Sequence, residues 1–233
     1  MKKLLSLFTG VQWMNHFFAF VGTCVGVLLA FFLTDYQEKR NDKDRLEKVV
    51  HQIRLEIEQN KSILENHADY LSKQIKAIDR IKPLLKADTS IWATEREIAS
   101  IIDSFPEFFI PEKKTLIKDS LYEWRGDMNI NFNMPGLSDI AWDNARALEV
   151  LHLVDFETSY MLFSLYKFQD YLKAEATSNM ELIKNLFKAP EEGGVFKIIF
   201  DDYYKKIHIL SSLEKNILEA YEGNLNNLEK RYY

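Results

Sequence analysis

The sequence predicts an all-α protein, in which an N-terminal transmembrane helix continues into an elongated antiparallel bundle of three long helices plus short helices. Two observations predict this fold. No Asp, Glu, Lys or Arg lies within residues 4–34. Three long stretches beyond that segment carry apolar residues at helical spacing. Because no window shows sustained alternation of apolar and polar residues, we expect almost no β-sheet.

The first element is the membrane span, predicted over residues 13–34 after a short tail over residues 1–12. At about 1.5 Å per residue, the helix from Trp13 to Tyr36 covers about 36 Å, enough to cross a hydrocarbon core of about 30 Å. Trp13 and Tyr36 are interfacial aromatic anchors at its two ends. The apolar run is too long for the core of a cleaved signal sequence, so we expect an uncleaved anchor.

Small residues recur along one face of this span. They permit close approach of a second helix, which is what holds helices together in lipid. Glycine and alanine are also common in membrane helices without forming contacts. We interpret the face as an interface for self-association or for a partner, and its residues are Ala19, Gly22, Gly26 and Ala30.

The charges on either side of the span bear on its orientation. Lys2 and Lys3 precede the span, whereas five basic residues follow it within residues 39–48. Taken literally, the positive-inside rule keeps the large domain in the cytoplasm. Those five residues alternate with acidic ones, and a long domain can translocate despite flanking charge. We favour a bacterial inner-membrane protein with a periplasmic domain, and a cytoplasmic domain is the alternative.

The second element is a long stalk helix, predicted over residues 35–82, which contain no Gly or Pro. Its apolar residues have an average spacing near 3.6, the period of an amphipathic helix. Either helices of the same chain or other copies must cover this stripe. Asn60 also lies on the stripe, where it could fix the register of a coiled coil or face a wet gap; we favour the gap. The stripe consists of Leu46, Val50, Ile53, Ile57, Leu64, Leu71, Ile75 and Ile78.

Residues 83–233 are predicted to form a helical bundle that packs against the stalk. Pro83 ends the stalk helix, and Thr89 or Ser90 caps a helix that reaches about residue 104. Two prolines make residues 105–111 an extended connection, and a further helix is expected over 115–127. A polar loop over 129–135 closes this half.

The second half begins with a helix capped by Ser138 that continues to His152. Asp155 then caps a long helix over about 156–188. A joint at 190–194 contains Pro and Gly, and a third long helix runs from Val195 to the C-terminus.

Several short motifs resemble an uncharacterised group of bacterial single-pass membrane proteins that carry a domain of unknown function. The span ends in residues 26–31 and is followed by Glu38-Lys39-Arg40, and a coiled helix comes next. Residues 141–145 form Ala-Trp-Asp-Asn-Ala before His152-Leu153, and Tyr166-x-x-Gln169 lies on the next helix. The resemblance covers about half of the chain. It implies the architecture of an anchor, a coiled helix and a helical C-terminal domain, and it implies no activity.

The sequence offers little chemistry. A net charge of -5 without a basic stripe argues against nucleic acid as a partner. The single cysteine, Cys24, lies in the span. Glu149 and His152 have the Glu-x-x-His spacing of di-metal bundles, but such sites need a second copy of the motif, which the sequence lacks. No phosphate loop or nucleophile elbow occurs. We therefore expect neither an enzyme nor a cofactor.

The sequence-based hypothesis is a membrane-anchored helical scaffold or interaction protein. It contacts membrane lipid, forms a homo-oligomer, and presents its soluble bundle to a membrane or envelope protein. The alternative is a helical module that senses a small ligand and signals through a partner, since ligands can bind between helices.

Overall fold

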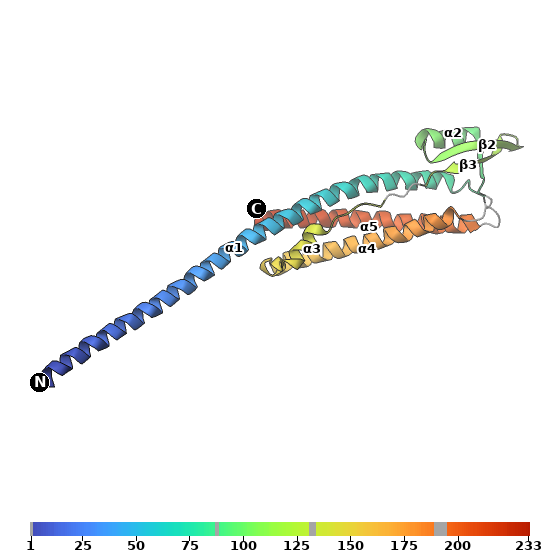
Figure 1. Ribbon diagram of the computed structural model, residues 1–233. Coiled ribbons are helices and arrows are strands. Elements are labelled where there is room, and N and C mark those ends of the chain that lie inside the picture. Colours follow the sequence, from blue (N-terminus) through green and yellow to red (C-terminus); the bar gives the residue numbers. More distant parts are fainter. Residues whose placement is uncertain (1, 87–88, 131–133, 189–194) are drawn as a thin grey trace.

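The computed structural model describes residues 2–86, 89–130, 134–188 and 195–233, with side chains from residue 13 onward. The chain is mostly helical, with 76% helix, which confirms the predicted helical character. The expectation of almost no β-sheet is wrong, because residues from three segments form a small three-stranded sheet. One very long helix projects far beyond the rest of the molecule (Figure 1).

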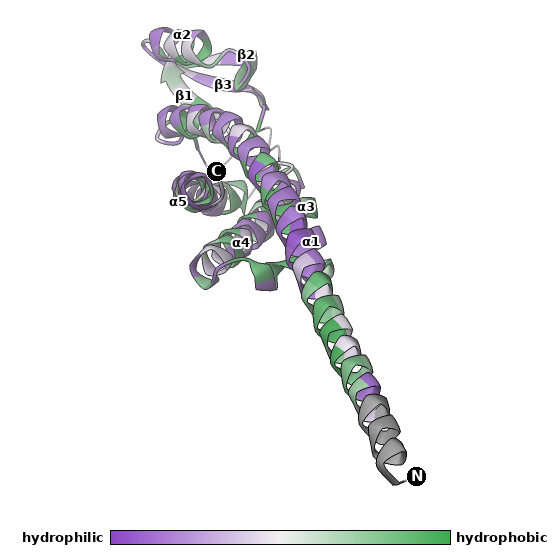
Figure 2. Cartoon of the chain, turned by 90° about the vertical axis from the view of Figure 1, so that its left-hand side faces the viewer, coloured by the Kyte–Doolittle hydropathy of each residue, from purple (hydrophilic) through white to green (hydrophobic). Residues whose placement is uncertain are grey.

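That helix is α1 (Lys2–Ile81), which runs without interruption for 80 residues. It therefore contains residues 2–12 of the predicted tail, the predicted span and the predicted stalk. It ends two residues before Pro83, whose ring and missing N–H oppose further helix. The hydropathy colouring along α1 changes from hydrophobic to hydrophilic as the helix approaches the bundle (Figure 2).

The last helix, α5 (Val195–Tyr232), packs along α1 in the opposite direction. Lys61 pairs with Glu222 at 2.9 Å near one end of the contact, and Lys82 pairs with Asp201 at 3.1 Å near the other. The helix predicted from Val195 onward is therefore observed, and it covers the part of α1 that lies inside the bundle (Figure 1).

The third long helix, α4 (Phe156–Leu186), packs against α5 on the side away from the distal sheet (Figure 1). Asp155 caps it, as the sequence predicts, because its carboxylate accepts the Thr158 N–H at 3.0 Å. Lys206 of α5 donates to Ser178 of α4 at 2.5 Å. Arg231 of α5 binds Asp155, so these two helices are antiparallel as well.

The apolar stripe of the stalk faces the core between these helices. In the structure, helices of the same chain cover it, so no second copy is needed to bury it. Leu46 and Ile75 are partly buried at the margin of the core. The fully buried members of the stripe are Val50, Ile53, Ile57, Leu64, Leu71 and Ile78.

A short helical corner precedes α4. Helix α3 (Ile140–Ala147) and the 3-10 helix η1 (Val150–Leu153) replace the single helix predicted up to His152. The helix breaks because Glu149 has φ 54°, in the left-handed region. Ser138 assists the start of α3 by accepting the Ile140 N–H at 3.3 Å, although Asp139 occupies the capping position.

The sheet lies beside the far end of α1 (Figure 1) and has the order β1-β3-β2 with antiparallel pairing throughout. Its strands are β1 (Ile91–Thr94), β2 (Phe109–Lys118) and β3 (Leu121–Met128). The helix predicted over 115–127 is therefore wrong. Both faces of the distal part of this hairpin are exposed, so the sequence shows no alternation that would reveal strands.

Helix α2 (Glu95–Ser104) starts later than predicted, because β1 occupies residues 91–94. Thr94 and Glu97 form a capping box at its start. The predicted connection over 105–111 contains a turn and then enters β2 at Phe109. The predicted joint at 190–194 and the centre of the predicted loop over 129–135 lie outside the described residues.

Candidate functional site

The predicted span forms the projecting part of α1. Among the described residues, α1 is the one helix that is long and apolar enough to cross a membrane by its length and composition. The side chains of the apolar stretch of this helix are not buried by any other part of the described chain. Trp13 and Tyr36, the predicted interfacial anchors, are both exposed near the two ends of this segment.

The predicted packing face also lies on this projecting segment. Ala19, Gly22, Gly26 and Ala30 are spaced by three or four residues and so share one side of the helix. A Cβ added at Gly22 or Gly26 would meet no atom within 4 Å outside the backbone of the helix. Cys24 lies about 200° around the helix from Gly22, on the other side. The face is therefore open to an approaching helix.

A buried polar cluster fixes the α3 corner against the stalk. Glu56 of α1 lies at its centre, and its carboxylate accepts the Ser138 hydroxyl at 2.7 Å and the Ala141 N–H at 2.8 Å. The Tyr166 hydroxyl of α4 donates to the same carboxylate at 2.7 Å. The carboxylate thus occupies the N-terminus of α3, where unpaired N–H groups and the helix dipole favour an anion.

Asn60, one turn further along α1, extends the cluster. It donates to the Ser138 carbonyl at 2.7 Å and accepts the Ser138 N–H at 2.8 Å. Gln169 of α4 donates to the same carbonyl at 2.8 Å and accepts the Tyr221 hydroxyl at 2.9 Å. Asn60 is fully buried and paired, so the structure contradicts the wet gap that we favoured.

Aromatic packing completes this cluster. Trp142 stacks on Tyr166 with ring centroids 4.9 Å apart and planes 9° apart. Burial raises the pKa of Tyr166, and the hydrogen bond to Glu56 raises that pKa further, so the phenol stays a donor. The cluster brings together Trp142, Tyr166 and Gln169, which were singled out in the sequence, with Glu56, which was not. Its hydrogen bonds fix the position of α3.

A second buried pair joins α1 to α5. Nδ1 of His67 lies 2.6 Å from a carboxylate oxygen of Glu214, and both side chains are buried. Because the helical periodicity of α5 predicts an apolar residue at position 214, this contact could not be predicted from the sequence. The contact joins α1 and α5 at one register, while the other carboxylate oxygen of Glu214 is buried without a hydrogen-bond partner among the described residues.

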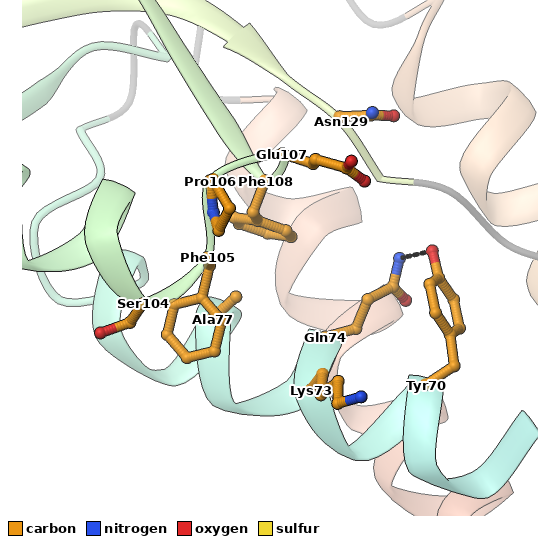
Figure 3. Close-up of a pocket in the computed structure, with 10 residues that line it drawn as sticks. All are labelled: Tyr70, Lys73, Gln74, Ala77, Ser104, Phe105, Pro106, Glu107, Phe108 and Asn129. Carbon is orange, nitrogen blue, oxygen red and sulfur yellow. Dashed lines mark hydrogen bonds between the residues drawn. The ribbon is translucent and has the colours of Figure 1, made fainter. Parts of the chain in front are cut away.

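A pocket opens between α1 and the connection from α2 to β2 (Figure 3). Its volume is about 410 Å³, within the usual range for small-molecule sites. Phe105 and Phe108 come from the connection, and Tyr70 and Gln74 come from α1, where Gln74 donates to the Tyr70 hydroxyl at 3.1 Å. Lys73, Ala77, Ser104, Pro106, Glu107 and Asn129 complete the lining.

The distal sheet presents a further surface. Strand β2 pairs with β3 on one side, and no strand of the described chain pairs with its other side. Leu116 on this strand is 58% exposed and Ile110 on the same strand is also exposed, whereas the exposed Trp92 lies on β1 at the opposite edge of the sheet. An open strand edge can bind an extended peptide through backbone hydrogen bonds. The sequence signal available for this hairpin was Asp119-Ser120, two residue types that are frequent in turns. In the structure Asp119 has φ 50°, in the left-handed region.

The Glu-x-x-His motif is not arranged as a metal site. Glu149 and His152 fall at the break between α3 and η1 rather than on one helix face, and the His152 ring contacts the Glu149 carbonyl. Among the described residues, no group of three or more His, Cys, Asp or Glu could hold a metal ion.

No protein-family model matches the chain, and searches of the curated proteins and of the solved structures find no match. The resemblance to uncharacterised bacterial single-pass membrane proteins therefore stays a prediction.

Proposed function

We propose that this chain is a single-pass membrane protein that acts as a helical scaffold or interaction module. The observation that carries the proposal is the continuity of α1, which bears an exposed apolar segment and then supplies one side of the bundle core. A helix without a joint holds its domain in a defined position relative to the bilayer. The proposal contains no catalytic step and no cofactor.

The length of α1 sets where the bundle presents its far end. From Tyr36 to Ile81 the helix rises by about 68 Å at about 1.5 Å per residue. The sheet with its open β2 edge lies at that end (Figure 1). We infer that the antiparallel bundle of α1, α5 and α4 is a spacer, and that the sheet is the surface it offers to an envelope protein.

Anchoring is tested by placing charges in the apolar segment. Val25→Arg combined with Leu29→Arg should move the protein out of the carbonate-resistant membrane fraction, since each Arg near the bilayer centre costs about 2.5 to 3.5 kcal/mol. The control variant carries Ile110→Arg and Leu116→Arg on the exposed sheet and should stay in the membrane fraction. Retention of the first variant would refute anchoring by this segment.

Self-association is tested by oxidative cross-linking. We infer that the chain forms a homo-oligomer through Ala19, Gly22, Gly26 and Ala30. A cysteine placed by Ala30→Cys in a Cys24→Ala background should form disulfide-linked dimers in membranes, whereas the native Cys24 on the opposite side should not. Gly26→Leu should abolish the cross-link by blocking close approach. Equal cross-linking at both positions would contradict this face.

The compartment is tested with a membrane-impermeant thiol reagent on intact bacterial cells. We propose a periplasmic bundle at the inner membrane. Glu112→Cys in the Cys24→Ala background places a single thiol at an exposed position on β2. Labelling without lysis is the expected result, and labelling only after lysis would place the bundle in the cytoplasm.

The partner surface is tested by photo-cross-linking. A photoreactive residue at Leu116, on the open strand, should give a discrete adduct in cells. The same residue at Phe168 of α4, where the native side chain is 52% exposed, should not give it. An adduct at Phe168 with none at Leu116 would move the docking surface from the sheet to the bundle.

The pocket of Figure 3 favours one other function, which is a ligand-sensing module that signals through a partner. Its test is native mass spectrometry of the purified chain. A bound small molecule should be absent from Ser104→Trp, because Ser104 lines the pocket and is exposed. Retention of the same molecule by that variant would exclude the pocket as its site.

A further inference from the structure

An exposed aromatic corner lies at the beginning of α4. We define it by Phe156, Tyr160 and Phe163, which line one shallow hollow together with Trp142 and Leu151. Phe156 is 86% exposed, more than any other large hydrophobic side chain that the structure describes, including those of the apolar segment. Tyr160 is 63% exposed and its ring stacks on that of Phe156 at 6.4 Å. Soluble surfaces rarely leave such a group uncovered.

The corner lies at the end of the bundle that is nearest the projecting part of α1 (Figure 1). The contacts place it there independently of the view. Asp155, directly before Phe156, binds Arg231 near the end of α5. The C-terminal Tyr233 contacts His51 at 3.3 Å, early in the stalk. Because Cα–Cβ bonds tilt toward the N-terminus of a helix, the side chains that begin α4 are directed toward the span.

The distance from the start of α4 to the bilayer depends on the tilt of the span. Leu148, at the end of α3, accepts a hydrogen bond from Arg45 at 3.3 Å, whereas the contacts of Asp155 with Arg231 and of Tyr233 with His51 place the start of α4 nearer the level of His51. Arg45 and His51 follow Tyr36 by about 14 Å and about 22 Å of helix rise. The headgroup region extends about 5 to 8 Å beyond the hydrocarbon. A span tilted toward α4 by about 30 to 40°, in the upper part of the usual range, brings the start of α4 down toward the headgroups.

The chemistry of the corner matches the lipid interface. Phenylalanine and tyrosine are the side chains that settle at the boundary between headgroups and acyl chains. The charged neighbours Asp155 and Glu157 pair with Arg231, and Arg146, which lines the same hollow, lies 3.6 Å from Asp143. The basic residues of α1 over 39–48 alternate with acidic ones, so the described charges near the corner are largely balanced. The contact should therefore form on zwitterionic lipid and resist salt.

We propose that the corner of Phe156, Tyr160 and Phe163 rests in the headgroup region of the bilayer that α1 crosses, as a second membrane contact. This inference rests on the proposed anchoring by α1. A bundle held at two points has its tilt fixed, and the distal sheet then points in one direction from the membrane surface.

The test uses the full chain in phosphatidylcholine vesicles, with Cys24→Ala and one cysteine that carries an environment-sensitive fluorophore. Tyr160→Cys places the probe in the corner. Tyr171→Cys is the matched control, because it replaces the same residue type on the same side of α4, about 16 Å farther from the span. Tyr171 is 50% exposed in the native chain. Flotation with the vesicles reports anchoring separately.

In the vesicles, the emission of the fluorophore at position 160 should shift to the blue. When headgroup-labelled quencher lipid is included, most of that emission should be lost. The fluorophore at position 171 should show neither change. High salt should leave the result unaltered. Phe156→Ser should reduce the quenching at 160, while flotation stays complete. Floating protein without quenching at 160 would overturn the contact and leave the anchor intact.

Two other results also overturn the proposal. Quenching only with anionic lipid would identify a charge-driven contact rather than aromatic insertion. A blue shift that requires high chain density and shows no lipid quenching would assign the corner to contact with a second copy. Failure of the chain to float would refute the anchor itself.

Discussion

Glu56→Ala is expected to destabilise the α3 corner strongly. The carboxylate is buried and accepts hydrogen bonds from Ser138, Ala141 and Tyr166 at 2.7 to 2.8 Å. Hydrogen bonds to charged groups contribute about 1.5 to 3 kcal/mol each, and an unpaired buried donor costs about 1 to 3 kcal/mol. The two hydroxyls can rotate toward other acceptors, whereas the Ala141 N–H cannot. We therefore expect a loss of about 3 to 5 kcal/mol, below the simple sum.

The isosteric change Glu56→Gln separates charge from shape. The Gln amide keeps one oxygen acceptor, but its NH2 group replaces the other oxygen and faces groups that donated to it. We therefore expect the free energy of unfolding to fall by about 1 to 2 kcal/mol. The control is Glu58→Ala, two residues along α1, where Glu58 pairs with Arg54 on the exposed face. Exposed pairs contribute about 0 to 1 kcal/mol, so this variant should unfold close to the parent.

The assay is denaturant unfolding of the full chain in detergent micelles, followed by near-ultraviolet circular dichroism. Hydrogen exchange should locate the loss of protection in residues 138–154 before the rest of the bundle. A midpoint for Glu56→Ala equal to that of Glu58→Ala would refute the role given to the carboxylate, because no other described group replaces it at the start of α3.

Three further outcomes are expected. Gly126→Ala should abolish exchange protection over 109–128 and spare the long helices, because an added Cβ would lie 2.1 Å from the Ile110 carbonyl; retained protection would contradict the strand pairing. Ile57→Ala should cost about 2 to 5 kcal/mol in the same unfolding assay, and the partly exposed Ile63→Ala far less; equal losses would show that the stripe is not core. Burial acts to raise the pKa of Asp155, but hydrogen bonds from Thr158 and Tyr232 and the charge of Arg231 outweigh it and lower that pKa. The stabilisation is complete above the unfolded pKa of about 3.9 and is lost as pH falls through the folded value. Asp155→Asn should remove this acid sensitivity from the exchange rates at the start of α4, and an unchanged pH profile would contradict it.

The long helices could be predicted because their determinants are local. A stretch such as 35–82, without Gly or Pro and with one apolar stripe, has one favourable backbone state. Caps such as Asp155 are also local signals. The predicted positions of Val195 and Pro83 at helix boundaries agree with α5 and α1 for that reason.

The sheet and the polar cluster depend on partners that are distant in sequence. Residues 115–127 include helix formers such as Leu116, Lys118 and Leu121, yet they form the end of β2, a turn and most of β3. The pairing of β3 with β2 and with β1 holds them in strands. The charged residues around Glu56 in the sequence suggest an exposed helix surface. Its carboxylate is nevertheless buried and accepts a hydrogen bond from Ser138, which lies 82 residues away. Asn60 was expected to face a wet gap, but its amide pairs with the backbone carbonyl and N–H of Ser138.

The unbroken α1 also fixes a rotational phase between its two halves. Gly26 on the small-residue face and Ile53 on the core stripe are 27 positions apart. At about 3.6 residues per turn this separation is close to seven and a half turns, so the two faces point to opposite sides of the axis. Two chains paired through Gly26 would therefore have their α1 helices in contact and their bundles on the two outer sides of the pair, where the bundles do not collide. Inserting one residue between Tyr36 and Arg45 would rotate each bundle by about 100° around the axis of its own α1.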